Sequence, residues 1–313
     1  MKPTRSLILR VAVAGGVLGL LAWKVGGQPF TDGLLALTPT ALLAGLILGA
    51  VATVSCAWRW RVVAGGLGLP LTLQEAALAY YRSTFLNVTV PGGVVGDVHR
   101  AVDHGRSAGD VSRGLRAVTW ERVAGQGVQV VVTLTAIVLL PSPAQGWAPI
   151  ALAVVTALAL ALLALRCWNQ GPAGRLVRGA AQDIRAGVLA RPALPAVLIA
   201  SVVVVACHTT TFVIAARAAG AVAGLDRLIP LSLLVLAAMA VPLSFAGWGL
   251  REGAAAWAFG AAGLGAATGV TAAVVYGVLV LVASLPGAAV LLAARRRGMT
   301  PTRSPHTPEV AHG

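Results

Sequence analysis

Apolar runs of about 20 residues recur along the chain, and they constrain the fold more than any other feature. Of the 313 residues, 58% are hydrophobic and only 11% are charged, and the mean hydropathy is +0.84. Soluble domains carry roughly a quarter charged residues, whereas about 20 apolar residues suffice to cross a hydrocarbon layer about 30 Å thick. The sequence therefore predicts an all-α polytopic membrane protein. The predicted full spans are 6–25, 39–58, 123–141, 148–166, 195–216 and 270–293.

The basic residues lie in short clusters between the apolar runs, which is the pattern of cytoplasmic loops rather than of a nucleic-acid interface. This distribution predicts no nucleic-acid partner, a cytoplasmic-membrane location and both termini in the cytoplasm. No signal-peptide cleavage site follows the run 6–25, so it is predicted to be an uncleaved first helix. One membrane domain is predicted over 1–298, followed by a polar, proline-rich, disordered cytoplasmic tail over 299–313. The basic clusters are Lys2 to Arg10, Arg59 with Arg61, 100–122, 166–191 and 295–297.

Two further segments, 74–100 and 230–256, are apolar but interrupted, and they share one plan. Each has an apolar half, then proline and glycines, then an arginine beside an acidic residue. Arg100 follows Pro91 by nine residues, and Arg251 follows Pro242 by nine. The loop charges place the two segments on opposite sides of the membrane, as an inverted repeat of re-entrant helices would. The alternatives are eight full crossings, or a coincidence among residue types that are common in this chain.

Proline and adjacent glycines are expected to break each interrupted segment, because proline lacks an N–H and clashes with the preceding turn. A backbone exposed at membrane depth is tolerated only against protein or a water-filled cavity. Helix N-termini there favour an anion, so arginines beside them are predicted to complete a phosphate site. The alternative is that these arginines extend to the headgroup boundary as anchors. The predicted break residues are Pro91, Gly92, Gly93, Gly96, Pro242, Gly247 and Gly249.

Other polar residues within the apolar runs are weaker candidates. Gln126 and Gln129 are spaced to face one side of a helix, where they could line a cavity or bond a neighbouring helix. His208 in the run 195–216 predicts an interhelical hydrogen bond, with a proton-relay role as the alternative. The cysteines show no metal-ligand spacing, and no P-loop, HExxH or GxSxG motif is present. The sequence therefore predicts no cofactor, no metal site and no enzyme activity.

Three stretches resemble the signatures of the lysylphosphatidylglycerol synthase transmembrane family, also called the flippase-like or UPF0104 membrane proteins. They are "VPGGVVGDVHRAV" (90–102), "WERVAG" (120–125) and "VPLSFAGWGLREG" (241–253). The resemblance extends from about residue 7 to 295. It implies a membrane domain related to the half of the bifunctional synthases that moves lipid outward. No segment corresponds to the soluble half that makes the lipid, so the resemblance carries no synthase activity.

Together these features predict a lipid flippase or lipid-binding transporter that moves a phospholipid or polyprenyl-linked headgroup across the membrane. Arg100 and Arg251 are expected to hold the headgroup phosphate at facing half-helix ends, while acidic neighbours position them or contact an amine or sugar. One alternative is a non-transporting subunit that presents lipid to a cytoplasmic transferase. Another is a membrane transferase that uses Asp97 or Glu121 as a base. The predicted headgroup site comprises Asn87, Asp97, Arg100, Glu121, Arg122, Arg251 and Glu252.

Overall fold

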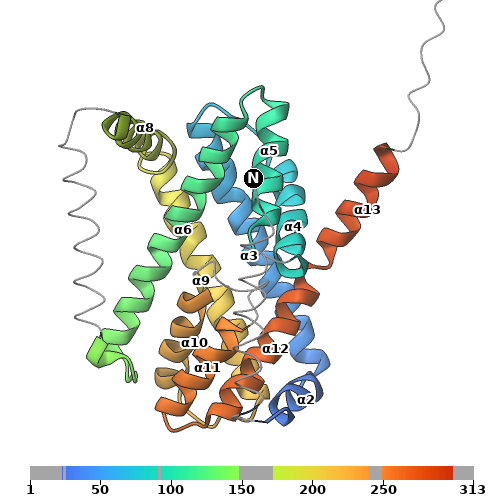
Figure 1. The fold of residues 1–313 in the computed structure, drawn as a ribbon, viewed down its shortest axis with the longest axis vertical. Helices are drawn as coiled ribbons and strands as arrows, with labels where there is room; N and C mark the ends of the chain where they lie inside the picture. The colour runs from blue at the N-terminus through green and yellow to red at the C-terminus, as the bar shows by residue number, and fades with distance from the viewer. Residues whose placement is uncertain (1–22, 24–25, 91–92, 148–171, 240–248, 299–313) are drawn as a thin grey trace, which may run out of the picture.

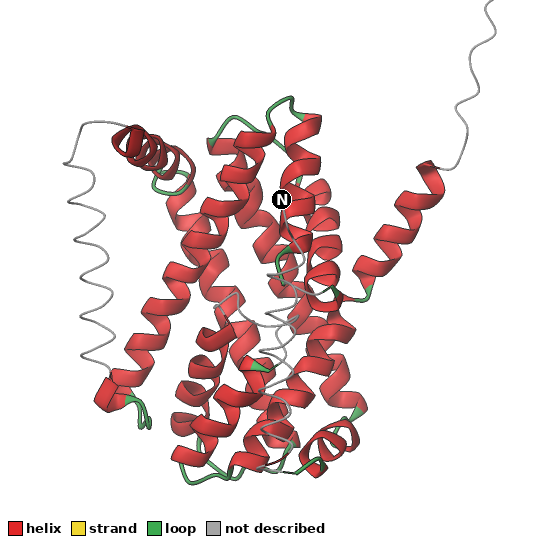
Figure 2. Cartoon of the chain, viewed as in Figure 1, coloured by secondary structure: helices red, strands yellow, loops and turns green. Residues whose placement is uncertain are grey.

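The computed structural model describes residues 23, 26–90, 93–147, 172–239 and 249–298, and all regular structure within these residues is helical (Figure 2). Four stretches are long and apolar enough to cross a membrane. The predicted spans at 6–25 and 148–166 and the predicted tail at 299–313 lie outside the described residues. The four long stretches are α3 (Pro39–Gly66), α6 (Val111–Leu139), α9 (Ala193–Ala218), and α12 (Ala266–Ser284) continued by α13 (Pro286–Gly298).

These four stretches confirm the predicted spans at 39–58, 123–141, 195–216 and 270–293, but they extend further than the hydropathy indicated. Helix α3 begins at Pro39, where the Thr38 hydroxyl accepts a hydrogen bond from the Ala41 N–H at 3.2 Å, and it continues to Gly66. At 1.5 Å per residue its 28 residues extend about 42 Å. Arg59 and Arg61 therefore lie inside α3, and the prediction of a loop at these residues is wrong.

Each interrupted segment contains two described helices, and for the first segment the predicted break is confirmed at Val90 and Gly93–Val94, whereas residues 240–248 of the second lie outside the described residues. The first contains α4 (Leu73–Thr89) and α5 (Val95–Ser107), and the second contains α10 (Leu225–Met239) and α11 (Leu250–Ala261). With 17, 13, 15 and 12 residues, each is shorter than the roughly 20 residues of a full span. Glycine is required where the chain enters the second helix, because φ is +63° at Gly93 and +93° at Gly249.

The other predicted break residues fall into two groups. Pro91, Gly92, Pro242 and Gly247 lie outside the described residues. Gly96 lies in the first turn of α5 and not in the break. Its absent side chain serves a different purpose, because a Cβ there would lie 2.0 Å from the Ser83 carbonyl oxygen of α4.

The helices form two groups, each with its own apolar core, and Figure 1 shows the groups toward opposite ends of the molecule. Helices α3 to α6 enclose a core around Trp60 and Tyr80. Helices α9 to α12 enclose a larger core around Phe212, Phe259 and Tyr276. The long helices α3 and α9 pack against each other and join the groups. Two short helices pack on the outside, α2 (Gln28–Leu35) on α12 and α8 (Pro172–Gly187) on α3 and α6, and α13, which continues α12, packs on α4.

The close approach of α4 and α5 predicts the effect of Gly96→Ala. The added methyl group would overlap the Ser83 backbone, so the helices must separate, and overpacking of this kind costs about 1–3 kcal/mol. Gly127→Ala is the matched control, because a Cβ at this α6 position meets no atom within 4 Å. Thermal unfolding of the detergent-purified protein is expected to show a lower midpoint for Gly96→Ala alone. Equal midpoints for the two variants would contradict the packing described.

Candidate functional site

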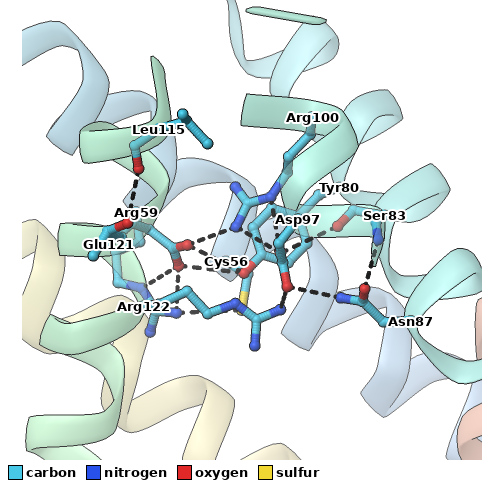
Figure 3. A network of polar contacts seen from close by, with 12 residues as sticks. Cys56, Arg59, Tyr80, Ser83, Asn87, Asp97, Arg100, Leu115, Glu121 and Arg122 are labelled. Carbon is cyan, nitrogen blue, oxygen red and sulfur yellow. Dashed lines mark hydrogen bonds and ion pairs between the residues drawn. The ribbon is translucent and has the colours of Figure 1, made fainter. Parts of the chain in front are cut away.

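Glu121, on α6, lies at the centre of a buried ionic network and has no exposed surface (Figure 3). One carboxylate oxygen accepts hydrogen bonds from Arg59 of α3, with Nε at 2.9 Å and Nη2 at 2.6 Å. The other accepts one from Arg100 Nη2 of α5 at 2.8 Å. The Tyr80 hydroxyl of α4 donates to the first oxygen at 3.2 Å. One carboxylate therefore connects four helices of the first group.

Asp97, in the first turn of α5, extends the network toward the helix break. Its carboxylate accepts hydrogen bonds from Arg100 Nε at 3.1 Å, Ser83 Oγ at 3.2 Å and Asn87 Nδ2 at 2.8 Å, and it pairs with Arg122 of α6. The side-chain amide oxygen of Asn87, Oδ1, in turn accepts a hydrogen bond from the Gly96 N–H at 2.8 Å. The side chains at positions 83 and 87 are one turn apart on α4, so they share a face. These bonds hold the start of α5 against the end of α4.

Aromatic rings supply the remaining surroundings of Arg100. Its guanidinium carbon lies 4.2 Å from the centre of the Tyr80 ring and 4.7 Å from that of the Trp60 ring. Such cation–π contacts stabilise a cation most strongly where water is excluded, and the Arg100 side chain has no exposed surface. Two carboxylates and two rings thus accommodate a buried charge that would otherwise be costly.

The second group of helices contains a smaller ionic pair at the start of α11. Arg251 donates from Nη2 to Glu252 at 2.6 Å and from Nε at 3.0 Å, and the other Glu252 oxygen accepts from the Gly249 N–H at 2.6 Å. The Arg251 guanidinium carbon lies 5.8 Å from the centre of the Tyr276 ring on α12. The Tyr276 hydroxyl is 2.9 Å from His208 Nδ1 on α9. The predicted interhelical hydrogen bond of His208 is therefore confirmed.

A cavity of about 330 Å³ lies between the two groups, with walls from α3, α4, α6, α9, α10 and α12. Asn87, Arg122 and Arg59 line it from the first group of helices, and His208 and Tyr276 line it from the second. Its volume is at the lower end of the range of small-molecule sites, about 300–1,000 Å³. Gln126 and Gln129 also line the cavity, which confirms one of the roles predicted for them.

The structure brings most of the predicted site residues together, but not all of them. Asn87, Asp97, Arg100, Glu121 and Arg122 form the first network, whereas Arg251 and Glu252 form a separate pair. Among the described residues, Asn87 and Arg122 line the cavity, and neither Arg100 nor Arg251 does.

Sequence reasoning missed several members of these clusters, among them Arg59, Tyr80 and Tyr276. For Arg59 a signal was available, because apart from Arg61 the residues that follow it as far as Ala64 are apolar and extend the run past it. Tyr80 and Tyr276 lie in apolar runs and carried no signal of their own. No group of three or more potential metal ligands occurs among the described residues.

Comparisons with known proteins are consistent with this arrangement. The family described as the lysylphosphatidylglycerol synthase TM region matches residues 7–287. The match includes both interrupted segments, the ionic network and the lining of the cavity. No curated protein matches the chain.

The central position of Glu121 predicts a large effect of Glu121→Gln. The substitution leaves Arg59 and Arg100 buried without a full counter-charge, and breaking a buried ion pair in this way costs about 3–5 kcal/mol. The control is Asp103→Asn, since Asp103 is 56% exposed in its pair with Arg82 and such surface pairs contribute about 0–1 kcal/mol. Chemical unfolding in detergent is expected to separate the two variants clearly. A Glu121→Gln protein as stable as the control would contradict the central role of this carboxylate.

Proposed function

The chain belongs to the lysylphosphatidylglycerol synthase TM family and is an integral, multi-pass membrane protein, and on this basis we propose that it is a lipid flippase. The observation that carries the proposal is the cavity between the two helix groups, which is bordered by an ionic network inside an apolar bundle. Ionic groups at such depth are costly, and in membrane proteins they mark substrate or ion pathways. The cavity is large enough for a headgroup, while the acyl chains remain in the lipid.

We further propose an inverted repeat of four helices, which would allow alternating exposure of the cavity. In this repeat α3, α4, α5 and α6 correspond to α9, α10, α11 and α12. Each packing contact then has a counterpart: α6 packs on α9 and α10, while α12 packs on α3 and α4. The contacts between consecutive helices also match, and α3 packs against α9, its own counterpart. A pseudo-two-fold relation between the halves would produce this pattern.

Equivalent residues occupy equivalent places in the two halves. Asp97 and Glu252 are each the third residue of their helix. Glycines 17 residues further on, Gly114 and Gly269, pack against the preceding helix, where a Cβ would lie 2.4 and 2.3 Å from a backbone oxygen.

A second pair of glycines makes room for a buried arginine in each half. A Cβ at Gly125 would lie 2.7 Å from Arg59 Nη1, and one at Gly277 would lie 2.3 Å from Arg251 Nη2. Arg59 lies on α3 and Arg251 on α11, which are not counterparts in the proposed repeat, so the matched positions of Asp97 with Gly114 and of Glu252 with Gly269 are what favour a repeat over coincidence.

The proposed roles of the site residues follow from their positions. Arg122 and Asn87 contact the headgroup from the cavity wall. Asp97, Arg100 and Glu121 hold these two side chains and the helix break in place, while Arg251 and Glu252 hold the start of α11. Since Asp97 and Glu121 each accept hydrogen bonds from at least three donors, their engagement argues against a role as general base. For this reason we propose that the protein is not an enzyme, and from its basic clusters we propose that it lies in the cytoplasmic membrane.

Transport is tested with the purified protein reconstituted into vesicles that contain fluorescent analogues of anionic phospholipids and of a polyprenyl-phosphate-linked sugar. The wild type is expected to move at least one of them, measured by quenching of the outer-leaflet label, and Arg122→Gln is expected to slow movement at least tenfold. Arg61→Gln is the control, since Arg61 is an exposed residue of α3 outside the cavity lining. A folded wild-type protein that binds lipid but moves none would overturn the proposal of a flippase and support the alternative of a subunit that presents lipid to a transferase.

A further inference from the structure

The network beside the cavity carries one more positive charge than negative charge. Arg59, Arg100 and Arg122 face only Asp97 and Glu121, so the formal charge of the five side chains is +1. An uncompensated charge in an apolar bundle is costly. A ligand with one negative charge would therefore complete the network.

The remaining acidic residues do not supply that charge. The chain has ten in all. Asp103, Asp110, Asp183 and Glu252 pair with other arginines, and Glu75 caps α4. Asp32 and Asp226 lie in α2 and α10, and neither lines the cavity. The tenth, Glu309, lies outside the described residues; the segments 1–22, 24–25, 91–92, 148–171 and 240–248, also outside them, contain no acidic residue.

Arg122 is the point at which the excess charge meets the cavity. The Arg59 and Arg100 side chains are at most 6% exposed and directed at Glu121, whereas the Arg122 side chain is 40% exposed and borders the cavity. One of its terminal nitrogens pairs with Asp97. Its Nε is buried and has no hydrogen-bond partner among the described residues. Arg100 Nη1 is likewise buried without a hydrogen-bond partner, so an oxyanion such as a phosphate would meet the exposed part of the Arg122 side chain and not its Nε.

The rest of the polar lining suits uncharged groups. Amide and hydroxyl side chains, among them Gln126, Gln129 and Thr211, can bond the hydroxyl groups of a glycerol or a sugar. The described lining contains no carboxylate, while two arginines border the cavity. An ammonium group in the cavity would therefore lack a counter-charge and be repelled by two cations.

From this charge balance we infer that the cavity binds a headgroup with one negative charge on a phosphodiester and uncharged hydroxyl groups, and that it disfavours headgroups bearing an amine. The inference rests on the proposed function and specifies its substrate class. Phosphatidylglycerol, whose headgroup is a glycerol, and sugars linked through a single polyprenyl phosphate share this chemistry. A phosphomonoester carries a charge of about −1.5 to −2 at pH 7 and would leave excess negative charge. Zwitterionic and aminoacylated lipids bring the ammonium group that the lining cannot neutralise.

The inference is tested by binding of short-chain lipids to the detergent-purified protein, measured as the ligand-dependent rise in unfolding temperature. The probes are dihexanoyl phosphatidylglycerol, phosphatidylethanolamine and phosphatidic acid at pH 7.5. The phosphatidylglycerol is expected to bind at least tenfold more tightly than each of the others. Glycerophosphoglycerol, which lacks acyl chains, distinguishes a lipid site from a site for a free phosphodiester. Equal or tighter binding of the ethanolamine lipid, or no binding of the glycerol lipid, would overturn the inference.

Two variants locate the site. Arg122→Gln is expected to weaken binding of the glycerol lipid at least tenfold. Because this change also removes a partner of Asp97, Gln126→Glu provides a test that does not depend on a lost ion pair. It adds a carboxylate one turn from Arg122 and is expected to reverse the preference toward the ethanolamine lipid. Gln182→Glu, on an exposed position of α8 outside the cavity lining, is the control and should change neither affinity.

The outcomes separate this inference from the flippase proposal. If vesicles show transport of an amine-bearing lipid, or if Gln126→Glu leaves the preference unchanged, the charge-balance inference fails and the flippase stands. If the glycerol lipid binds as expected but no lipid moves, the inferred headgroup specificity is kept and the flippase proposal is rejected.

Discussion

The arrangement of the first helix group depends on the buried Glu121 carboxylate. A carboxylate without exposed surface is tolerated only when cations and hydrogen-bond donors surround it, and here Arg59, Tyr80 and Arg100 bring α3, α4 and α5 against α6. Arg59 also donates to Ser201 Oγ of α9 at 2.9 Å, which connects the network to the other helix group. Through Arg100 and Asp97 the same network fixes the start of α5. Glu121 therefore holds the helix that follows the break, and with it one wall of the cavity, in place.

The two halves of the proposed repeat use related frameworks for different purposes. In each half a glycine makes room for a buried arginine. In each half, too, an acidic residue in the third position of a short helix accepts a hydrogen bond, Asp97 from Asn87 and Glu252 from the Gly249 N–H. In the first half the ions extend to the cavity and leave a positive charge there. In the second half Arg251 and Glu252 neutralise each other, and a hydrogen-bonded histidine and tyrosine form the cavity wall. Such an asymmetry would let one half bind the charged headgroup while the other provides an uncharged surface for it to pass.

The sequence predicted the elements of this structure better than their contacts. Hydropathy located the long helices because membrane depth demands apolar residues, and proline with glycine located the breaks because neither supports a continuous helix. The same hydropathy placed Arg59 outside the helix, because a charged residue after an apolar run resembles the end of a span. The residue that neutralises it, Glu121, lies 62 residues away in the sequence. Nothing in the sequence indicated that Arg100 and Arg251 belong to separate clusters: their equal offsets from proline suggested equivalent positions, yet Arg100 is the sixth residue of α5 and Arg251 the second residue of α11. Gly96 shows the same limit: its role is defined by the α4 backbone beside it.

The most direct test of the account is mass spectrometry of the lipids that remain bound to the gently purified wild-type protein. The account predicts that a lipid with one phosphodiester charge and no amine is enriched over its proportion in the surrounding membrane. Lipids bound in the same proportions as in that membrane, or enrichment of an amine-bearing lipid, would contradict it.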